Sequence, residues 1–380
     1  MMWLISLVLF GYVFYSLILP LRWKWRWQLS AGFLLLLIAQ KNTVFLWIGG
    51  GMFFSPELPR WLIIFASVCY GALILLFFLL IAKDLIRLVW SLAGRLRPRW
   101  RRPFPHRPVA ALLCILALVL AIDGTWEALR VPAVRTEEVI LPRLPAALDG
   151  FTVVLLADLH ASALNTEPFL RAIVDKANAL QPDLIVLNGD MVDGKVANRL
   201  ADVAPLADLK ARCGVFASPG NHEYYSGFDE WQAHFAAIGL PLLVNQHVLI
   251  EDNGATLALA GLADHAAERF NAERPDIRKA LDGVPPETVV LLLAHQPRQA
   301  ARNAAAGVDL QLSGHTHGGL IVLFDRLVAL FNDGLVSGWY EVDGMPLYVS
   351  PGTALWNGFP IRLGVPAEIT RLILRAAPGQ

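Results

Sequence analysis

Long apolar stretches in the first 130 residues set the strongest constraint on how this chain can fold. Residues 2–20 and 61–82 carry no charged side chain, and residues 108–126 carry only Asp123 near their end. Each stretch is close to the roughly 20 apolar residues that a helix needs to cross a bilayer. We interpret residues 29–54, which the polar run 40–42 interrupts, as a further span. A cleaved leader would give one such stretch rather than several, so the sequence predicts a membrane domain of about four transmembrane helices over residues 1–130.

Charge divides the chain into two parts, although the formal net charge is zero. Residues 1–130 hold 14 of the 32 Lys and Arg residues but only 4 of the 32 Asp and Glu residues. Basic side chains gather after the first predicted span, at 22–26, and between the last two, at 83–107. The positive-inside rule places both loops in the cytoplasm. With four spans, we expect a multi-pass protein of the cell (inner) membrane whose C-terminal domain is extracytoplasmic; if 29–54 does not cross, the side reverses.

The basic run "RLRPRWRRPFPHRP" at 95–108 has two interpretations. Such a run can bind nucleic acid, but tryptophan and arginine beside predicted spans are typical of a membrane surface. We therefore expect the membrane as a partner and no nucleic-acid partner. The sequence identifies no protein partner.

Residues 136–380 form a second region, in which short apolar runs alternate with helical patterns. This is typical of an α/β or α+β domain in which helices cover sheets. Buried strands are predicted at 151–157, 183–188, 214–218, 256–262, 288–294 and 308–313. Helices are predicted at 166–180, with Thr166 as its cap, and at 228–239 and 297–307.

Metal-capable side chains follow five of these apolar runs. They are Asp158 and His160, then Asp190, then Asn221, His222 and Glu223, then His295, and last His315 and His317. Ligand sites in α/β sheets lie at the carboxyl ends of strands, although Asp and Asn are also ordinary turn residues. Carboxylate, amide and imidazole donors suit Mn, Fe, Zn or Co rather than Ca or a thiolate zinc site. The set is too large for one tetrahedral ion and suits two divalent metal ions that share a bridging carboxylate, as in two-metal phosphoryl displacement.

The octapeptide "SGHTHGGL", residues 313–320, places two of these histidines one residue apart. Residues at i and i+2 point to opposite faces of a strand and lie far apart around a helix. A loop bent by its three glycines can instead let each ring reach a different neighbour. The alternative is a glycine turn that carries two exposed histidines.

The motifs "DLH", "NGD", "GNHE", "AHQP" and "GHTHGG", in this order, resemble the calcineurin-like metallophosphoesterase superfamily over about residues 136–380. The segments "GNHEYYSG" (220–227) and "SPGTALWNGFPIRLG" (350–364) are similar to its membrane-anchored bacterial branch. The resemblance implies an α/β four-layer metallophosphoesterase domain, with two mixed β-sheets flanked by helices, after the N-terminal transmembrane helices. It also implies a metal-dependent phosphoric ester hydrolase.

The resemblance further implies roles for individual residues. Asp158, His160 and His317 would hold one metal ion, Asn221, His295 and His315 the other, and Asp190 would bridge them, while His222 would protonate the leaving oxygen. For Glu223 we favour holding the loop over orienting His222. Ser162 stands where the family often has glycine, and Leu320 stands where the membrane-anchored bacterial branch often has glutamine. Neither is a ligand, so the departures concern substrate shape.

The remaining candidates have simpler interpretations. We expect Asp193 to support a ligand or form a turn rather than to bind metal. His234 falls inside a helical pattern, and His247 and His265 match no motif. All three are expected on the surface or in ordinary packing. Arg362 would meet either a substrate phosphate or a structural carboxylate. Tyr224, Tyr225 and Trp356 are expected to pack in the core rather than line a pocket rim.

Two classes of function follow. The first is a membrane-anchored phosphoesterase that hydrolyses phosphomonoesters or phosphodiesters by a metal-bridged hydroxide, with lipid or envelope phosphoesters among its candidate substrates. The second is a membrane sensor or scaffold that binds metal or a phosphorylated ligand without turnover. The complete ligand set and His222 favour the hydrolase.

Overall fold

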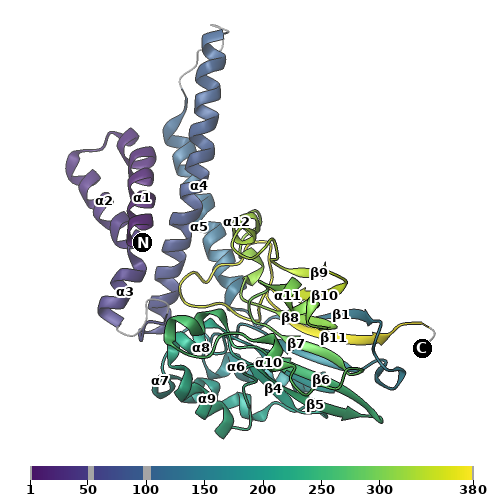
Figure 1. Ribbon diagram of the computed structural model, residues 1–380. Helices are drawn as coiled ribbons and strands as arrows, with labels where there is room; N and C mark the ends of the chain where they lie inside the picture. Colours follow the sequence, from purple (N-terminus) through teal and green to yellow (C-terminus); the bar gives the residue numbers. More distant parts are fainter. Residues whose placement is uncertain (1, 50–54, 97–103, 379–380) are drawn as a thin grey trace. The chain divides into compact units, whose positions relative to one another are not determined.

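The computed structural model describes residues 2–49, 55–96 and 104–378 and divides into two compact units (Figure 1). Residues 1–127 with the short segment 357–361 form the helical unit. Residues 128–356 with 362–380 form the two-sheet unit.

The helical unit contains the apolar stretches of the sequence. Its helices are α1 (Met2–Val13), η1 (Phe14–Ile18), η2 (Leu19–Leu21), α2 (Trp25–Ala39), α3 (Lys41–Gly49), α4 (Arg60–Leu96) and α5 (His106–Leu129). Three helical stretches, Trp3–Leu21, Arg60–Leu96 and His106–Leu129, are long and apolar enough to cross a membrane. The pair α2 and α3 makes a fourth if it counts as one span, but it bends by 70°. The end of the predicted span 29–54, and part of the basic run at 95–108, lie outside the described residues.

The bend in this pair coincides with the polar interruption of the predicted span. Lys41 is 3% exposed, and its ammonium donates hydrogen bonds to the carbonyls of Asn357, at 3.3 Å, and Gly358, at 3.0 Å, within the same unit. A cation among apolar helices is tolerated where acceptors surround it. Lys41, in the polar interruption, therefore binds the segment 357–361 to this helix pair through hydrogen bonds.

The described residues of the two-sheet unit contain eleven strands in two mixed sheets. The first has the order β1 (Ala133–Leu141), β11 (Glu368–Ala376), β2 (Thr152–Leu156), β3 (Leu184–Asn188), β4 (Val215–Ser218). The second has the order β5 (Gln246–Asp252), β6 (Ala255–Gly261), β7 (Val289–Leu293), β8 (Leu310–Ser313), β10 (Met345–Val349), β9 (Gly338–Val342). Within them β2–β3–β4 and β6–β7–β8–β10 run parallel.

Helices flank both sheets. They are α6 (Glu167–Ala179), α7 (Val196–Val203), α8 (Asn221–Ser226), α9 (Phe228–Ala237), α10 (Ile277–Ala280), α11 (Ala300–Ala305) and α12 (Asp325–Ala329), with short 3-10 turns η4 (Ala146–Leu148), η5 (Ala204–Asp208), η6 (His265–Phe270) and η7 (His317–Gly319). Side chains alternate between faces along a strand, so Val153 and Leu155 of β2 enter the core between the sheets. Val154 and Leu156 pack instead under α6, α7 and α9. Because β7 alternates in the same way between the central core and the layer under α10 and α11, the unit has four layers, which confirms the predicted fold class.

Most predicted elements are present, with small differences at their ends. Thr166 precedes α6, but its side chain makes no capping hydrogen bond. The predicted helix 297–307 begins only at Ala300, because Gln299 adopts a left-handed backbone with φ +65°. The strands β1, β5, β9, β10 and β11 add to those predicted.

Candidate metal centre

The loops that follow β2, β3, β4, β7 and β8 supply the predicted site residues. Asn188, at the end of β3, joins the ends of the two sheets: its amide donates to the carbonyl of Leu312 on β8 at 2.7 Å. Its carbonyl lies 2.9 Å from Nδ1 of His295, the residue that follows β7 and Ala294. Strand ends far apart in the sequence are therefore held at one edge of the sandwich.

One cluster combines Asp158, His160 and His317, all buried. The Nε2 atoms of the two histidines lie 3.4 Å apart. Asp158 Oδ1 lies 3.7 Å from Nε2 of His317 and 4.0 Å from Nε2 of His160. Donors around one ion at roughly 2.0–2.2 Å are separated by about 3.0–3.6 Å, so this spacing is close to that of a ligand set.

A second cluster combines Asp190, His295 and His315. Asp190 Oδ2 lies 3.2 Å from Nε2 of His295 and 3.9 Å from Nε2 of His160, so it reaches both clusters. Its other oxygen accepts a hydrogen bond of 2.8 Å from the backbone N–H of His222. Asn221 begins α8 directly after the β4 loop, and it immediately precedes His222 in the chain. The geometry fits a carboxylate shared by two ions.

Backbone strain accompanies this arrangement. Five of the seven predicted ligands have positive φ: Asp158 (58°), His160 (44°), Asp190 (52°), His315 (70°) and His317 (49°). Such angles are uncommon for non-glycine residues and persist where the surroundings fix them, often at functional sites.

Two glycines let the loops approach closely enough. A Cβ on Gly314 would lie 2.5 Å from Oδ2 of Asp158, and one on Gly189, where φ is +75°, would lie 2.4 Å from the ring of His295. In place of such a clash, the N–H of His315 donates to both oxygens of Asp158 at 3.1 Å. Gly314 of the octapeptide thus permits contact between its loop and the one after β2.

Asp193 joins the candidate centre in a way that the sequence only partly indicated. Its Oδ1 lies 3.2 Å from Nδ1 of His160 and 2.5 Å from Nδ1 of His222. The shorter separation is that of a hydrogen bond rather than of two ligands on one ion. A carboxylate that accepts a hydrogen bond from Nδ1 fixes the tautomer and orientation of a histidine ring. Asp193, the second aspartate of "GDMVDG", thus contacts two histidines at once.

Glu223 holds the backbone of the centre rather than His222. Its carboxylate accepts hydrogen bonds from the N–H groups of Gly220 (2.7 Å), Asp190 (2.9 Å) and Met191 (2.7 Å). These bonds tie the β4 loop to the β3 loop, as favoured from the sequence. Burial, followed by the charge of Asp190, raises the pKa of Glu223 to about 7.

Protonation in the centre follows burial and the packed carboxylates. Burial raises the pKa of Asp158 to about 6 and lowers the pKa of His315 to about 3, so this imidazole is neutral and can offer a lone pair. Burial also disfavours the charged form of His222, but Asp190 and Asp193 outweigh it and raise its pKa to about 9. His222 therefore carries a proton at neutral pH, as a proton donor requires.

The donor set fits divalent metal ions. Among the described residues, the side-chain oxygen of Asn221 and Nε2 of His295 are buried without a hydrogen-bond partner. Buried polar atoms are normally satisfied, and a cation held by these residues would satisfy both. Carboxylate, amide and imidazole donors are of the kind that hold divalent metal ions.

Other candidates lie around the centre or away from it. Trp356 lies against the rings of His317 and His160, with centroids 4.9 and 6.1 Å apart, and Tyr225 lies 5.3 Å from the ring of His222. Their rings thus border the centre, although packing in the core was expected. Arg362 is buried and donates to backbone carbonyls, among them Pro351 at 2.7 Å and Ala354 at 3.1 Å, a role that neither interpretation anticipated.

The three unassigned histidines and Ser162 belong to neither cluster. His234 lies on α9, His247 bonds the carbonyl of Ala280 at 2.8 Å, and His265 begins η6. Ser162 is buried, and its hydroxyl accepts from the N–H of Asn165 at 3.2 Å, which shapes the loop after β2.

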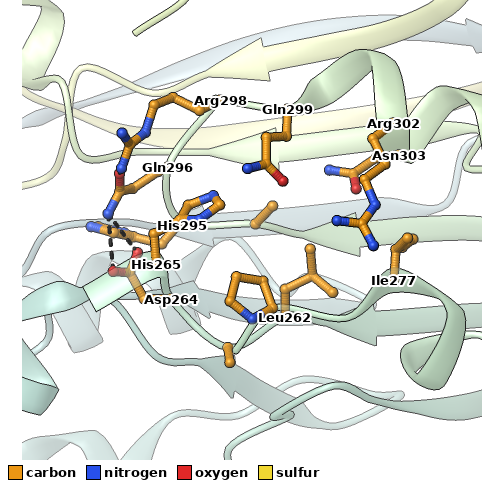
Figure 2. Close-up of a pocket in the computed structure, with 13 residues that line it drawn as sticks. Leu262, Asp264, His265, Ile277, His295, Gln296, Arg298, Gln299, Arg302 and Asn303 are labelled. Atoms are coloured by element: carbon orange, nitrogen blue, oxygen red, sulfur yellow. Dashed lines mark hydrogen bonds between the residues drawn. The ribbon is translucent and has the colours of Figure 1, made fainter. Parts of the chain in front are cut away.

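A pocket borders His295 on the side of α11, and Figure 2 shows its polar lining. Arg298 donates to the side-chain oxygen of Gln296, whose amide nitrogen lies 2.9 Å from both oxygens of Asp264. Asp264 in turn accepts from the N–H of Ala266 at 2.7 Å. This chain of hydrogen bonds explains the glutamine of "AHQP": it fixes the loop that carries His295.

Comparisons with known proteins agree with this geometry. The sequence model of the calcineurin-like phosphoesterase family matches residues 151–319. The chain is 36% identical over 346 residues to a Bos taurus protein named transmembrane protein with metallophosphoesterase domain, covering 86% of this chain and 77% of that protein. A Danio rerio protein of the same name is 34% identical over 344 residues, with the same shares covered. An uncharacterized metallophosphoesterase of Campylobacter jejuni is 32% identical over 314 residues, covering 81% of this chain and 80% of that one. With relatives in vertebrates and bacteria alike, the chain belongs to the calcineurin-like phosphoesterase family.

Proposed function

We propose that this protein is a membrane-anchored phosphoesterase that uses two divalent metal ions to hydrolyse phosphomonoesters or phosphodiesters. The observation that carries the proposal is the position of Asp190 between the two clusters. Its Oδ2 lies 3.2 Å from Nε2 of His295 in one cluster and 3.9 Å from Nε2 of His160 in the other. Asp158, His160 and His317 would hold one ion, Asn221, His295 and His315 the other, and Asp190 both. When bound, two such ions act as Lewis acids on the phosphoryl oxygens and acidify water near neutral pH.

The chain's own residues complete the reaction. Asp193 lies against Nδ1 of His222, and the side chain of His222 is 11% exposed, enough for the ring to meet a bound ester. It would donate its proton to the leaving oxygen as the ester bond breaks. Glu223 accepts a hydrogen bond from the backbone N–H of Asp190, and Asp190 accepts one from the backbone N–H of His222. These bonds fix the proposed shared ligand and the proposed proton donor relative to each other.

Metal-dependent turnover tests this function directly. Full-length protein stripped with a chelator should be inactive on bis(4-nitrophenyl) phosphate and regain turnover when Mn²⁺, Fe²⁺, Zn²⁺ or Co²⁺ is added, because the ligand set suits these ions. Release of nitrophenolate, followed by absorbance, measures it. Metal binding without turnover on aryl mono- or diesters would favour the sensor or scaffold instead.

The anchoring helices bear on the substrate and on the side of the membrane. The positive-inside rule favours a cytoplasmic position for the basic loops at 22–26 and 83–107. If the bent pair α2–α3 crosses as one span, the two-sheet unit is extracytoplasmic. Lipid or envelope phosphoesters of the cell (inner) membrane are then the substrates within reach, and cytoplasmic nucleotides are not.

A reporter fusion tests this topology. A reporter that is active only outside the cytoplasm, fused after Gln380, should be active, because an even number of crossings follows from the basic loops. Fusion of the same reporter in the basic loop, after Arg95, provides the inactive control. An active cytoplasmic reporter at Gln380 would reverse the sidedness and leave the chemistry untouched.

A further inference from the structure

Large apolar side chains are concentrated on one short part of the two-sheet unit's surface. Residues 320–336, which we call the apolar loop, expose Val322, Leu323, Leu327, Leu330 and Phe331. Leu323, Leu330 and Phe331 are 75–76% exposed, more than any other large apolar side chain described in this unit. Contiguous exposed apolar side chains of this kind mark interaction sites rather than ordinary surface.

Both ends of the apolar loop are attached to the loop that carries the candidate ligands. The N–H of Leu320 donates to the carbonyl of His317 at 3.2 Å, and the hydroxyl of Thr316 donates to the carbonyl of Val336. Leu320 also accepts from the N–H of Leu363 at 3.0 Å. Whatever the apolar loop contacts is therefore brought next to the metal centre.

A groove lies beneath the apolar loop. It has a volume of roughly 470 Å³, within the range of small-molecule pockets. Apolar side chains line much of it, namely Val322, Ala329, Val336, Tyr340 and Val365. Gly318, the residue that follows His317, is also part of the lining. The charged lining residues Asp325 and Arg326 approach each other at 3.6 Å. The lining therefore suits a hydrocarbon chain better than a sugar or a nucleobase.

The short linker between α5 and β1 indicates what covers this surface. The helix α5 is one of the three that are long and apolar enough to cross a membrane. Only residues 130–132 separate its end, Leu129, from the start of β1 at Ala133. A fully extended linker of this length spans at most about 14 Å. A two-sheet unit tethered so closely stays at the bilayer surface, where exposed leucine and phenylalanine side chains find an apolar medium.

We propose that the apolar loop inserts into the bilayer interface and that the groove beneath it takes an acyl chain of a lipid phosphoester. This rests on the proposed function, and it names the substrate class: a phosphate ester whose headgroup reaches the metal centre while its acyl chain stays in the groove. Such a lipid would pass along the apolar loop as it moves from the bilayer to the metal centre at His317.

Depth-dependent quenching tests the contact independently of turnover. Full-length protein with Cys69, Cys114 and Cys213 replaced by alanine, carrying Phe331→Cys labelled with an environment-sensitive fluorophore, is placed in phosphatidylcholine–phosphatidylglycerol nanodiscs. Spin-labelled lipids with a shallow label should reduce its fluorescence by about two-fold, because interfacial side chains lie at that depth. The matched control is Leu249→Cys on β5, an exposed apolar residue of the same unit (46%) that should show no such loss.

Equal quenching at positions 331 and 249 would overturn the proposal. Shielding at position 331 that depends on protein concentration but not on the spin label would also overturn it, in favour of a second copy of the chain. Turnover of bis(4-nitrophenyl) phosphate by the labelled protein checks that the centre is intact. If no variant and no parent protein turns over this ester, the proposed function fails while the quenching still decides whether the loop contacts lipid.

Discussion

Replacing Asp190 with asparagine should abolish hydrolysis and lower the number of divalent ions bound per chain. The substituted amide keeps the size of the side chain and an oxygen for the N–H of His222, which bonds Asp190 at 2.8 Å. It loses the negative charge and the second oxygen that lies 3.2 Å from His295. Residues that only orient metal ligands cost 10–100-fold when changed, so a shared ligand should cost more than about 100-fold in kcat.

Metal analysis separates this effect from simple unfolding. Bound metal, measured by mass spectrometry after gel filtration, should fall from two ions toward one or none. The control is Asp183→Asn at the opposite end of β3, where the carboxylate bonds the N–H of Thr152 and the guanidinium of Arg212, both at 2.7 Å. That variant should lose stability but keep its metal. Full activity in Asp190→Asn with unchanged metal content would contradict the shared carboxylate.

The parts of the fold nearest the candidate centre could be predicted because their strands are buried on both faces. The strands β2, β3 and β7 are continuous apolar runs of five residues or nearly so, as parallel strands between two layers are. A polar residue that ends such a run is conspicuous, so the candidate ligands could be found together with the strands. In contrast, β1 is exposed along most of its length and β11 pairs with it across more than 200 residues, so neither its pattern nor its partner is local.

What could not be predicted depends on how loops meet in space. Asp193 is three residues after Asp190, and sequence spacing alone does not show that it reaches both His160 and His222. Arg362 lies 45 residues from His317, yet its guanidinium lies 3.4 Å from that residue's carbonyl. Lys41, at the bend between α2 and α3, likewise finds its acceptors in the far segment 357–358. These contacts arise from tertiary packing, which a single sequence does not encode in any local pattern.

Replacing His222 with alanine should slow the hydrolysis of alkyl phosphates far more than that of nitrophenyl phosphates. A poor leaving group must be protonated as it departs, whereas nitrophenolate is a stable anion and leaves unaided. General acid catalysis contributes about 10²–10⁴-fold, so we expect a loss of that order on alkyl esters and about ten-fold or less on nitrophenyl esters. Steady-state kcat on the two ester series measures the difference.

Two further variants distinguish proton donation from ligand support. His222→Ala should keep its bound metal, because its Nε2 is not required by either cluster, whereas Asp193→Asn should lose leaving-group selectivity and also bind metal more weakly, since Asp193 lies 3.2 Å from Nδ1 of His160. His234→Ala on α9 should change neither quantity. Equal losses on both ester series in His222→Ala, accompanied by a fall in metal content, would assign His222 to metal binding through the cluster that it forms with His160 and Asp193.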